Sequence, residues 1–415
     1  MIDADVLADV LIIGGGMVGL TLATALGAEG LDVTVLDRDD PRGVLDAAFD
    51  GRVSAIALGS RRVLETLDLW RVLAPEAEAI RDIRVSDGAS PLVLDFDHSA
   101  VGDEPMGHIV ENRALRRALL QRVTPMANVQ LLAPVKVVSL AFGVGKVEVA
   151  LDDGRKPKAR LLVAADGRNS WTRHDQGIAT TEWSYPQAAI VCTVVHSRPH
   201  RGLAHERFLP PGPFAILPMT DDSSKQGQVR HRSSIVWTEH AERVPELLAL
   251  DDVGFNQELA RRFGGELGDV AVLGGRWSYP LSLMLAERYV GDRLALVGDA
   301  GHAIHPIAGQ GLNMGLRDVA ACAEVVVEAW RLGLDIGHGV VLERYQEWRR
   351  FDNVTLAAVT DGLNRLFSND VAPVRMARRV GLAAINRIAP AKRLFMHHAM
   401  GVVGDLPRLV RGEPL

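Results

Sequence analysis

The sequence has little of several features that mark whole classes of protein. Only two of its 415 residues are cysteines, which excludes a disulfide framework, a cysteine-rich zinc site and a CxxC redox centre. A reducing cytoplasm is therefore the expected compartment. Basic residues do not outnumber acidic ones, and the formal net charge of −6 argues against a nucleic-acid partner. With 47% hydrophobic and 24% charged residues, the chain is expected to fold into two or three domains.

Charge is also missing from one long stretch near the N-terminus, between Val10 and Ala28. Its length alone would suffice for a membrane span. The stretch is rich in glycine, however, and the first basic residue of the chain is Arg38, so the basic region that opens a signal peptide is lacking. We therefore expect the stretch to serve something other than lipid.

The same stretch contains a glycine-rich fingerprint between two predicted strands. Residues 10–13 and 31–36 are short apolar runs typical of strands buried on both faces, and the segment between them reads G-x-G-x-x-G followed by a helical pattern. Gly14 permits the tight turn, Gly16 lets a pyrophosphate approach the backbone, and Gly19 lets helix and strand pack closely. The pattern predicts a dinucleotide site, although glycines that serve packing alone would give the same letters.

Acidic residues end three predicted strands. Asp37 can accept hydrogen bonds from a ribose, and Asp166 and Asp299 each follow a further apolar run. Open α/β sheets bind ligands at the carboxyl ends of their strands. The glycine-rich segment 309–313 precedes a predicted helix over 314–332, whose N-terminus can present main-chain N–H groups to a flavin ring. This third site favours FAD over a simple nicotinamide dehydrogenase.

These three stretches resemble the fingerprint, DG and GD motifs of the class A flavoprotein aromatic monooxygenases. The segment from His305 to Asp318, HPIAGQGLNMGLRD, further resembles the signature of the FAD-dependent ubiquinone-biosynthesis hydroxylases, the UbiH/UbiF/Coq6 group. Weaker matches follow in the right order through most of the chain. Asp37 stands where Glu is commoner and Gly301 where Ala is usual, and neither departure changes the assignment.

The resemblance implies an α/β fold with a Rossmann-like FAD-binding domain of the para-hydroxybenzoate hydroxylase type. Because its three motifs must converge, this domain is expected to be discontinuous, with an inserted antiparallel-sheet substrate domain and a helical C-terminal region. The expected division is 1–80, 108–178 and 277–340 for the FAD domain, 81–107 and 179–276 for the substrate domain, and 341–415 for the helical region.

The predicted cofactor contacts come from all three motifs. Asp299 is expected at the ribityl chain, main-chain groups of 311–313 at the flavin pyrimidine edge, and Pro306 and Gly309 around the ring. No side chain is assigned as catalytic, since most of the chemistry belongs to the flavin. The full predicted set, to which the resemblance contributes the arginines and the DG residues, is Gly14, Gly16, Gly19, Asp37, Arg38, Arg52, Arg113, Asp166, Gly167, Arg173, Gly298, Asp299, Pro306, Gly309, Gly311, Leu312 and Asn313.

His302 and His305 are three positions apart, a spacing that also suits a metal. No third ligand accompanies them, so no metal is expected, and His302 is expected to be a packed residue or one that supports the site.

The resemblance implies that the protein hydroxylates the aromatic ring of a polyprenylated phenol in ubiquinone biosynthesis, with O₂ as co-substrate and through a flavin C4a-hydroperoxide. Only one G-x-G-x-x-G is present, so NAD(P)H is expected to bind transiently, unless a separate reductase supplies the electrons. Three alternatives stay open: a hydroxylase of soluble aromatics, an FAD-linked dehydrogenase or prenyl reductase, and an FAD-stabilised scaffold. Partners from a ubiquinone-biosynthesis complex are consistent with the resemblance.

A basic tract lies near the C-terminus, over 371–400, where six lysines and arginines occur without any acid. Such a tract can rest on anionic lipid, or it can be a solvated helix face that pairs with acids elsewhere. Because ubiquinone precursors carry polyprenyl tails, the resemblance adds a peripheral location on the inner face of the cytoplasmic membrane to the cytoplasmic expectation.

Overall fold

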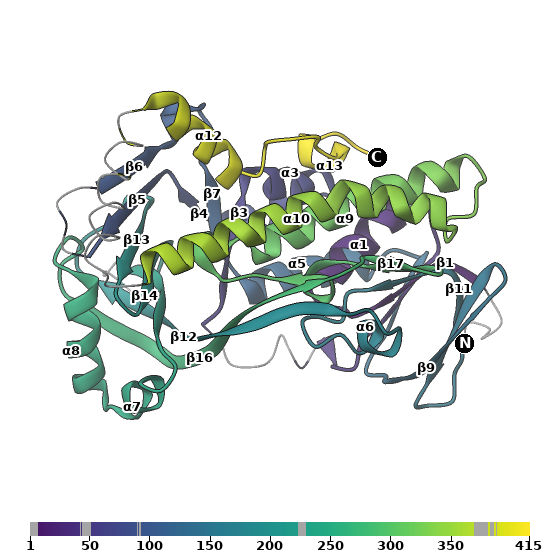
Figure 1. The fold of residues 1–415 in the computed structure, drawn as a ribbon, viewed down its shortest axis with the longest axis horizontal. Helices are drawn as coiled ribbons and strands as arrows, with labels where there is room; N and C mark the ends of the chain where they lie inside the picture. Colours follow the sequence, from purple (N-terminus) through teal and green to yellow (C-terminus); the bar gives the residue numbers. More distant parts are fainter. Residues whose placement is uncertain are drawn as a thin grey trace.

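The computed structural model describes residues 7–41, 43, 51–88, 90, 93–222, 230–368, 381, 386 and 388–415. Two large sheets lie toward opposite ends of the molecule, and two long helices run across both (Figure 1). A small third sheet is formed by β3 (Val53–Ala57), β7 (Gly107–Glu111) and β4 (Glu78–Ile80).

The first sheet is built around five parallel strands in the order β18-β11-β1-β2-β8. Val10, Leu11 and Ile12 of β1 are fully buried, as expected for a strand covered on both faces. The strands predicted over 10–13 and 31–36 are therefore found. The strands of this sheet are β1 (Leu7–Ile13), β2 (Val33–Leu36), β8 (Val129–Leu132), β9 (Val137–Gly143), β10 (Lys146–Leu151), β11 (Lys158–Ala164), β17 (Val290–Gly291) and β18 (Leu294–Leu296).

The second sheet has the order β19-β16-β12-β15-β14-β13-β5-β6 and is antiparallel except where β13 pairs with β5. Helices α7 (Val244–Ala249) and α8 (Asp252–Phe263) cover one face through a core that includes Phe214, Trp237 and Phe255. Its strands are β5 (Asp82–Asp87), β6 (Val93–Asp97), β12 (Thr180–His196), β13 (Leu203–Leu209), β14 (Gly212–Asp222), β15 (Arg230–His240), β16 (Val270–Ala286) and β19 (His302–Ala303).

An inserted antiparallel sheet is thus present. One of its strands, β16, crosses the boundary expected after residue 276 and pairs with β12 on both sides of it. The expected domain limits remain predictions.

Two long helices connect the sheets. α9 (Gly311–Arg331) packs against α1 (Met17–Ala28), and α10 (Gly339–Phe367) packs along α9 and reaches the second sheet. There Phe367 stacks on Phe208, with ring centroids 3.9 Å apart, and Asn364 donates to the Gln187 side-chain oxygen at 3.1 Å. The remaining helices are α3 (Leu58–Thr66), α4 (Trp70–Leu73), α5 (Asn112–Val123), α6 (Trp171–Asp175), α12 (Ala389–Ala399) and α13 (Arg408–Arg411), and the short 3₁₀ turns are 74–76, 98–100, 298–300 and 307–309.

The helices bear on the membrane question in two ways. Among those in the described ranges, none combines the length and apolar composition that crossing a bilayer requires. Lys392 and Arg393 of the basic tract lie on α12, where Arg393 is exposed. The other four basic residues of the tract, Arg375, Arg378, Arg379 and Arg387, lie outside the described residues.

Candidate FAD and substrate site

The three motifs meet at one edge of the first sheet, because β1, β11 and β18 are neighbouring parallel strands. Gly14 has a φ of +109°, and a Cβ there would overlap the carbonyl oxygen of Ala165, which follows β11. A Cβ on Gly19 would overlap the carbonyl oxygen of Gly14. Around Gly16, by contrast, a Cβ would meet no atom within 4 Å. Gly14 and Gly19 therefore serve packing, whereas Gly16 leaves open space.

That open space lies at the start of α1, whose first turn has no side-chain cap and no acidic residue. Such a helix terminus offers N–H groups and a positive dipole end to an anion. The Asp37 carboxylate lies beside the turn, where Oδ2 accepts from the Gly15 N–H at 2.5 Å and Oδ1 from the Asp39 N–H at 2.8 Å. Arg38 is at the surface, 3.6 Å from the Asp39 carboxylate.

The DG residues connect the second and third motifs. Oδ2 of Asp166 accepts from the Thr172 N–H and hydroxyl at 3.0 and 2.9 Å, and Gly167 follows it in the same turn. The buried Arg173 guanidinium donates to the carbonyl oxygens of Ala300 and Arg168 at 2.8 and 2.9 Å. Burial lowers the pKa of Arg173. This arginine therefore holds the DG turn against the GD turn.

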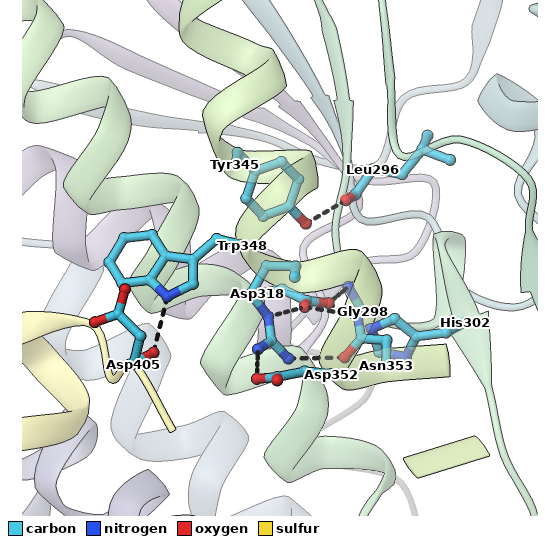
Figure 2. A network of polar contacts seen from close by, with 10 residues as sticks. Leu296, Gly298, His302, Asp318, Tyr345, Trp348, Asp352, Asn353 and Asp405 are labelled. Atoms are coloured by element: carbon cyan, nitrogen blue, oxygen red, sulfur yellow. Dashed lines mark hydrogen bonds and ion pairs between the residues drawn. The ribbon is translucent and has the colours of Figure 1, made fainter. Parts of the chain in front are cut away.

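A buried carboxylate lies behind the GD turn (Figure 2). Asp318 Oδ2 accepts from the Gly298 N–H at 3.0 Å and lies 2.5 Å from His302 Nε2, while Oδ1 accepts from Arg349 and Asn353 at 2.9 and 3.2 Å. Burial alone would raise the pKa of Asp318, but its ion pairs with His302 and Arg349 outweigh that effect and hold the pKa well below its usual range. The network fixes a turn in which Gly298 has a φ of +60°.

That turn determines the position of Asp299. Gly298 and Ala300 on either side of it are buried, whereas the Asp299 side chain is exposed. Tyr345 of α10 reinforces the same edge of the sheet by donating to the Leu296 carbonyl at 2.6 Å.

The first turn of α9 is joined to the small sheet and to the segment that precedes the helix. The Asn313 side chain donates to the carbonyl oxygens of Ala55 and Gly309 at 2.8 and 3.1 Å and accepts from the Ala57 N–H at 2.9 Å. α9 starts at Gly311 without a side-chain cap, and a Cβ on Gly311 would meet no atom within 4 Å. Leu312 packs against the core of the first sheet. The helix terminus is thus held in place and left open.

A cavity of about 270 Å³ lies between this segment and the second sheet. Two predicted residues line it, Arg52 and Pro306, and the Arg52 guanidinium lies 5.8 Å from the centre of the Tyr279 ring. Its wall is largely apolar: the lining residues are Arg52, Val53, Arg168, Ala189, Val191, Ser234, Val236, Tyr279, Pro280, Leu281, Ser282, Ile304 and Pro306.

Arg113 and His305 are not among the residues that line this cavity. Arg113 is half exposed and pairs with Glu111 at 2.8 Å. His305 is fully buried, and burial lowers its pKa to about 4, so the ring is neutral at pH 7. Within the described ranges, one group of three side chains has metal-ligand spacing, Asp82, Asp97 and His98, and it includes neither His302 nor His305.

Sequence reasoning assigned no role to Asp318, Arg349 or the Asn313 side chain. The available signal was the position of Asp318 one helical turn from the apolar Met314 and Cys322 on a helix that is typical of core, since an acid there needs partners. The partners themselves come from α10 and could not be named from that pattern.

Several features of the site fit a bound dinucleotide with a flavin. There is open space over Gly16 and Gly311, and the helices that start there have no side-chain cap. Asp166 Oδ1 is buried without a hydrogen-bond partner among the described residues.

Comparison with known proteins gives matches along nearly the whole chain. The FAD binding domain family matches residues 7–349. Ubiquinone hydroxylase UbiL of Rhodospirillum rubrum is 52% identical over 415 residues, which cover 99% of this chain and 94% of that protein. The 3-demethoxyubiquinol 3-hydroxylase of Escherichia coli is 34% identical, covering 95% and 98%. The mitochondrial ubiquinone biosynthesis monooxygenase COQ6 of Xenopus tropicalis is 32% identical, covering 94% and 93%.

Solved structures agree on the fold. The p-nitrophenol 4-monooxygenase PnpA of Pseudomonas putida has a TM-score of 0.76 at 18% identity, covering 95% of this chain and 98% of that one. PqsL of Pseudomonas aeruginosa has a TM-score of 0.74 at 23% identity, covering 90% and 99%. At these identities the likeness shows the fold alone.

Proposed function

Because the chain belongs to the FAD-dependent ubiquinone-biosynthesis hydroxylases, we propose that it hydroxylates the aromatic ring of a polyprenylated phenol on the route to ubiquinone. The observation that carries this proposal is the position of the apolar cavity. It is bounded by Ile304 and Pro306, which immediately precede the open N-terminus of α9, and by the second sheet. An aromatic ring in this cavity would lie beside the segment that faces the flavin.

The chain's own groups bind and orient the cofactor. The turn at Gly16 receives the pyrophosphate, Asp37 the adenosine ribose, Asp299 the ribityl chain, and the first main-chain N–H groups of α9 the pyrimidine edge of the ring. Reduced FAD, when bound, supplies the chemistry that activates O₂. The apolar lining keeps water from the reacting ring.

The reductant is NAD(P)H, bound transiently. A second cavity, of about 510 Å³, borders the DG turn and is lined by Arg168, Asn169 and His174, whose donors suit phosphate groups. Addition of NADPH to the purified holoprotein without O₂ is expected to bleach the flavin absorbance stoichiometrically. Reduction only after a separate reductase is added would assign the electrons to that partner instead.

The protein acts at the membrane surface that holds its substrate. Helix α12 exposes Leu394 and Phe395 by about half of their surface, next to the exposed Arg393. Apolar side chains beside a cation suit an anionic interface. A double variant with Phe395→Ser and Arg393→Glu is expected to be recovered on anionic liposomes in smaller amount than the wild-type protein. Arg344→Glu, elsewhere on the surface, is the control. Equal recovery of all three proteins would count against this helix.

The reaction is tested by deleting the gene and identifying the accumulated quinone precursor by mass spectrometry, together with turnover of that precursor by the purified holoprotein. Accumulation of a polyprenylated phenol that lacks one ring hydroxyl is the expected result. An unchanged quinone profile with turnover of soluble aromatics would favour the alternative substrate class.

A further inference from the structure

The second sheet presents one face to the cavity through its two central strands. Ala189 and Val191 of β12 and Ser234 and Val236 of β15 all line the cavity. Residues directly opposite each other in an antiparallel pair place their side chains on the same face. Since Thr193 pairs with Ser234, it lies beside Ser234 on the cavity face.

Both of these residues carry a buried hydroxyl group. Ser234 and Thr193 are 0% and 2% exposed, and neither hydroxyl has a hydrogen-bond partner in the part of the chain that the structure describes. An unpaired buried hydroxyl is unfavourable, and of the two residues Ser234 lines the cavity, where a ligand could pair with its hydroxyl. The neighbouring Ser233, on the opposite face, is paired with His196 Nε2 at 2.9 Å. The two faces of β15 thus differ: the covered face pairs its hydroxyl, and the cavity face does not.

Two charged groups of the cavity contact other residues of the protein. Arg168 donates to the Ser282 hydroxyl, and Arg52 lies over the Tyr279 ring. The rest of the wall is mostly aliphatic and suits the carbon surface of a ring and its prenyl chain. A prenylated phenol has its polar atom in one place, the ring oxygen, and a serine hydroxyl can both donate to such an oxygen and accept from its proton.

We propose that Ser234 is the specificity residue that binds the ring oxygen of the aromatic substrate. The inference rests on the proposed function and extends it to the orientation of the ring. Anchoring the oxygen on β15 fixes the rotation of the ring in the cavity, and therefore fixes which ring carbon is presented for hydroxylation.

The test compares two ligands of the same shape, ortho-prenylphenol and prenylbenzene, on the FAD-loaded protein. Dissociation constants are measured from the change in flavin absorbance. The wild-type protein is expected to prefer the phenol by about fivefold, the effect of a typical net hydrogen bond, and Ser234→Ala to lose most of that preference. Ser234→Thr, which keeps a hydroxyl, is expected to retain it.

Thr238→Val is the matched control. Thr238 lies on the same strand and face, is 2% exposed, and also has no partner for its hydroxyl in the described ranges, yet it does not line the cavity. This variant is expected to keep the wild-type preference, and the unfolding midpoint and flavin spectrum verify that each variant is folded.

The outcomes separate this inference from the function on which it rests. If the wild-type protein hydroxylates the phenol but Ser234→Ala keeps the full preference, the specificity site is wrong and the proposed function stands. If the wild-type protein neither binds nor hydroxylates the phenol, both are rejected. A changed ratio of product regioisomers in Ser234→Ala supports the orientation argument.

Discussion

The carboxylate of Asp318 and the hydroxyl of Ser234 are both fully buried, yet their surroundings differ. Asp318 has hydrogen bonds from Gly298, Arg349 and Asn353 and an ion pair with His302, whereas Ser234 has no partner among the described residues. The first group holds a turn whose shape is complete within the chain. The second lies on the wall of a cavity, where a ligand can complete it. This difference distinguishes residues that support the shape of the site from residues that recognise its ligand.

The largest expected effect comes from breaking the Asp318 network. Asp318→Asn removes a buried charge that Arg349 needs, and loss of one partner of such a pair costs about 3–5 kcal/mol of unfolding free energy. Urea unfolding measures it. Arg344→Gln, which removes an exposed pair with Glu328 at 2.9 Å, is the control and should cost less than about 1 kcal/mol. Similar losses in the two variants would contradict the assigned role.

The glycines of the fingerprint also differ in role: one supports the fold, and another leaves room for the ligand. Gly16→Ala is expected to leave the stability of the protein unchanged but to weaken FAD binding about 10- to 100-fold, because its Cβ enters open space and displaces the pyrophosphate from charge-assisted hydrogen bonds. Gly19→Ala is expected to destabilise the protein itself by about 1–3 kcal/mol, because its Cβ overlaps the Gly14 carbonyl. Calorimetric FAD titration and thermal unfolding distinguish the two, and an exchange of these phenotypes would overturn the division.

The network also predicts a pH dependence. The folded-state pKa of Asp318 is lowered, so its stabilising effect is fully present above the unfolded value of about 3.9 and is lost as the pH falls. The stability difference between the wild-type protein and Asp318→Asn should be constant from neutral pH to about 5 and should then shrink, by at most about 1.4 kcal/mol per pH unit. A difference that grows in acid would mean that the carboxylate is not the stabilising form.

The smallest expected effect is on the cavity wall. Ser234→Ala removes a buried hydroxyl without a partner in the described structure, so the stability of the ligand-free protein is expected to stay the same or rise slightly. Thermal unfolding without ligand measures this. A loss of more than about 1 kcal/mol would show that the hydroxyl is already paired within the protein.

The elements predicted from sequence are those whose signal is local. Apolar runs identified β1 and β2, and the glycine spacing identified the turn at Gly14, because both depend on residues close together in the chain. His302 was expected to pack or to support the site, and it contacts Asp318. The partner of Asp318 on α10 and the neighbour of Ser234 on β12 depend on helix packing and strand register, which a single sequence does not specify. Arg113 as an FAD contact rests on resemblance and stays a prediction.

The central claim is that the chain uses FAD to insert oxygen from O₂ into a polyprenylated phenol. The most direct test is turnover of such a phenol by the purified, FAD-loaded protein with NADPH under ¹⁸O₂, followed by mass spectrometry of the product. The account predicts one labelled oxygen in each hydroxylated ring. A hydroxyl that carries unlabelled oxygen from water, or a product that is dehydrogenated or reduced without gaining oxygen, would contradict it.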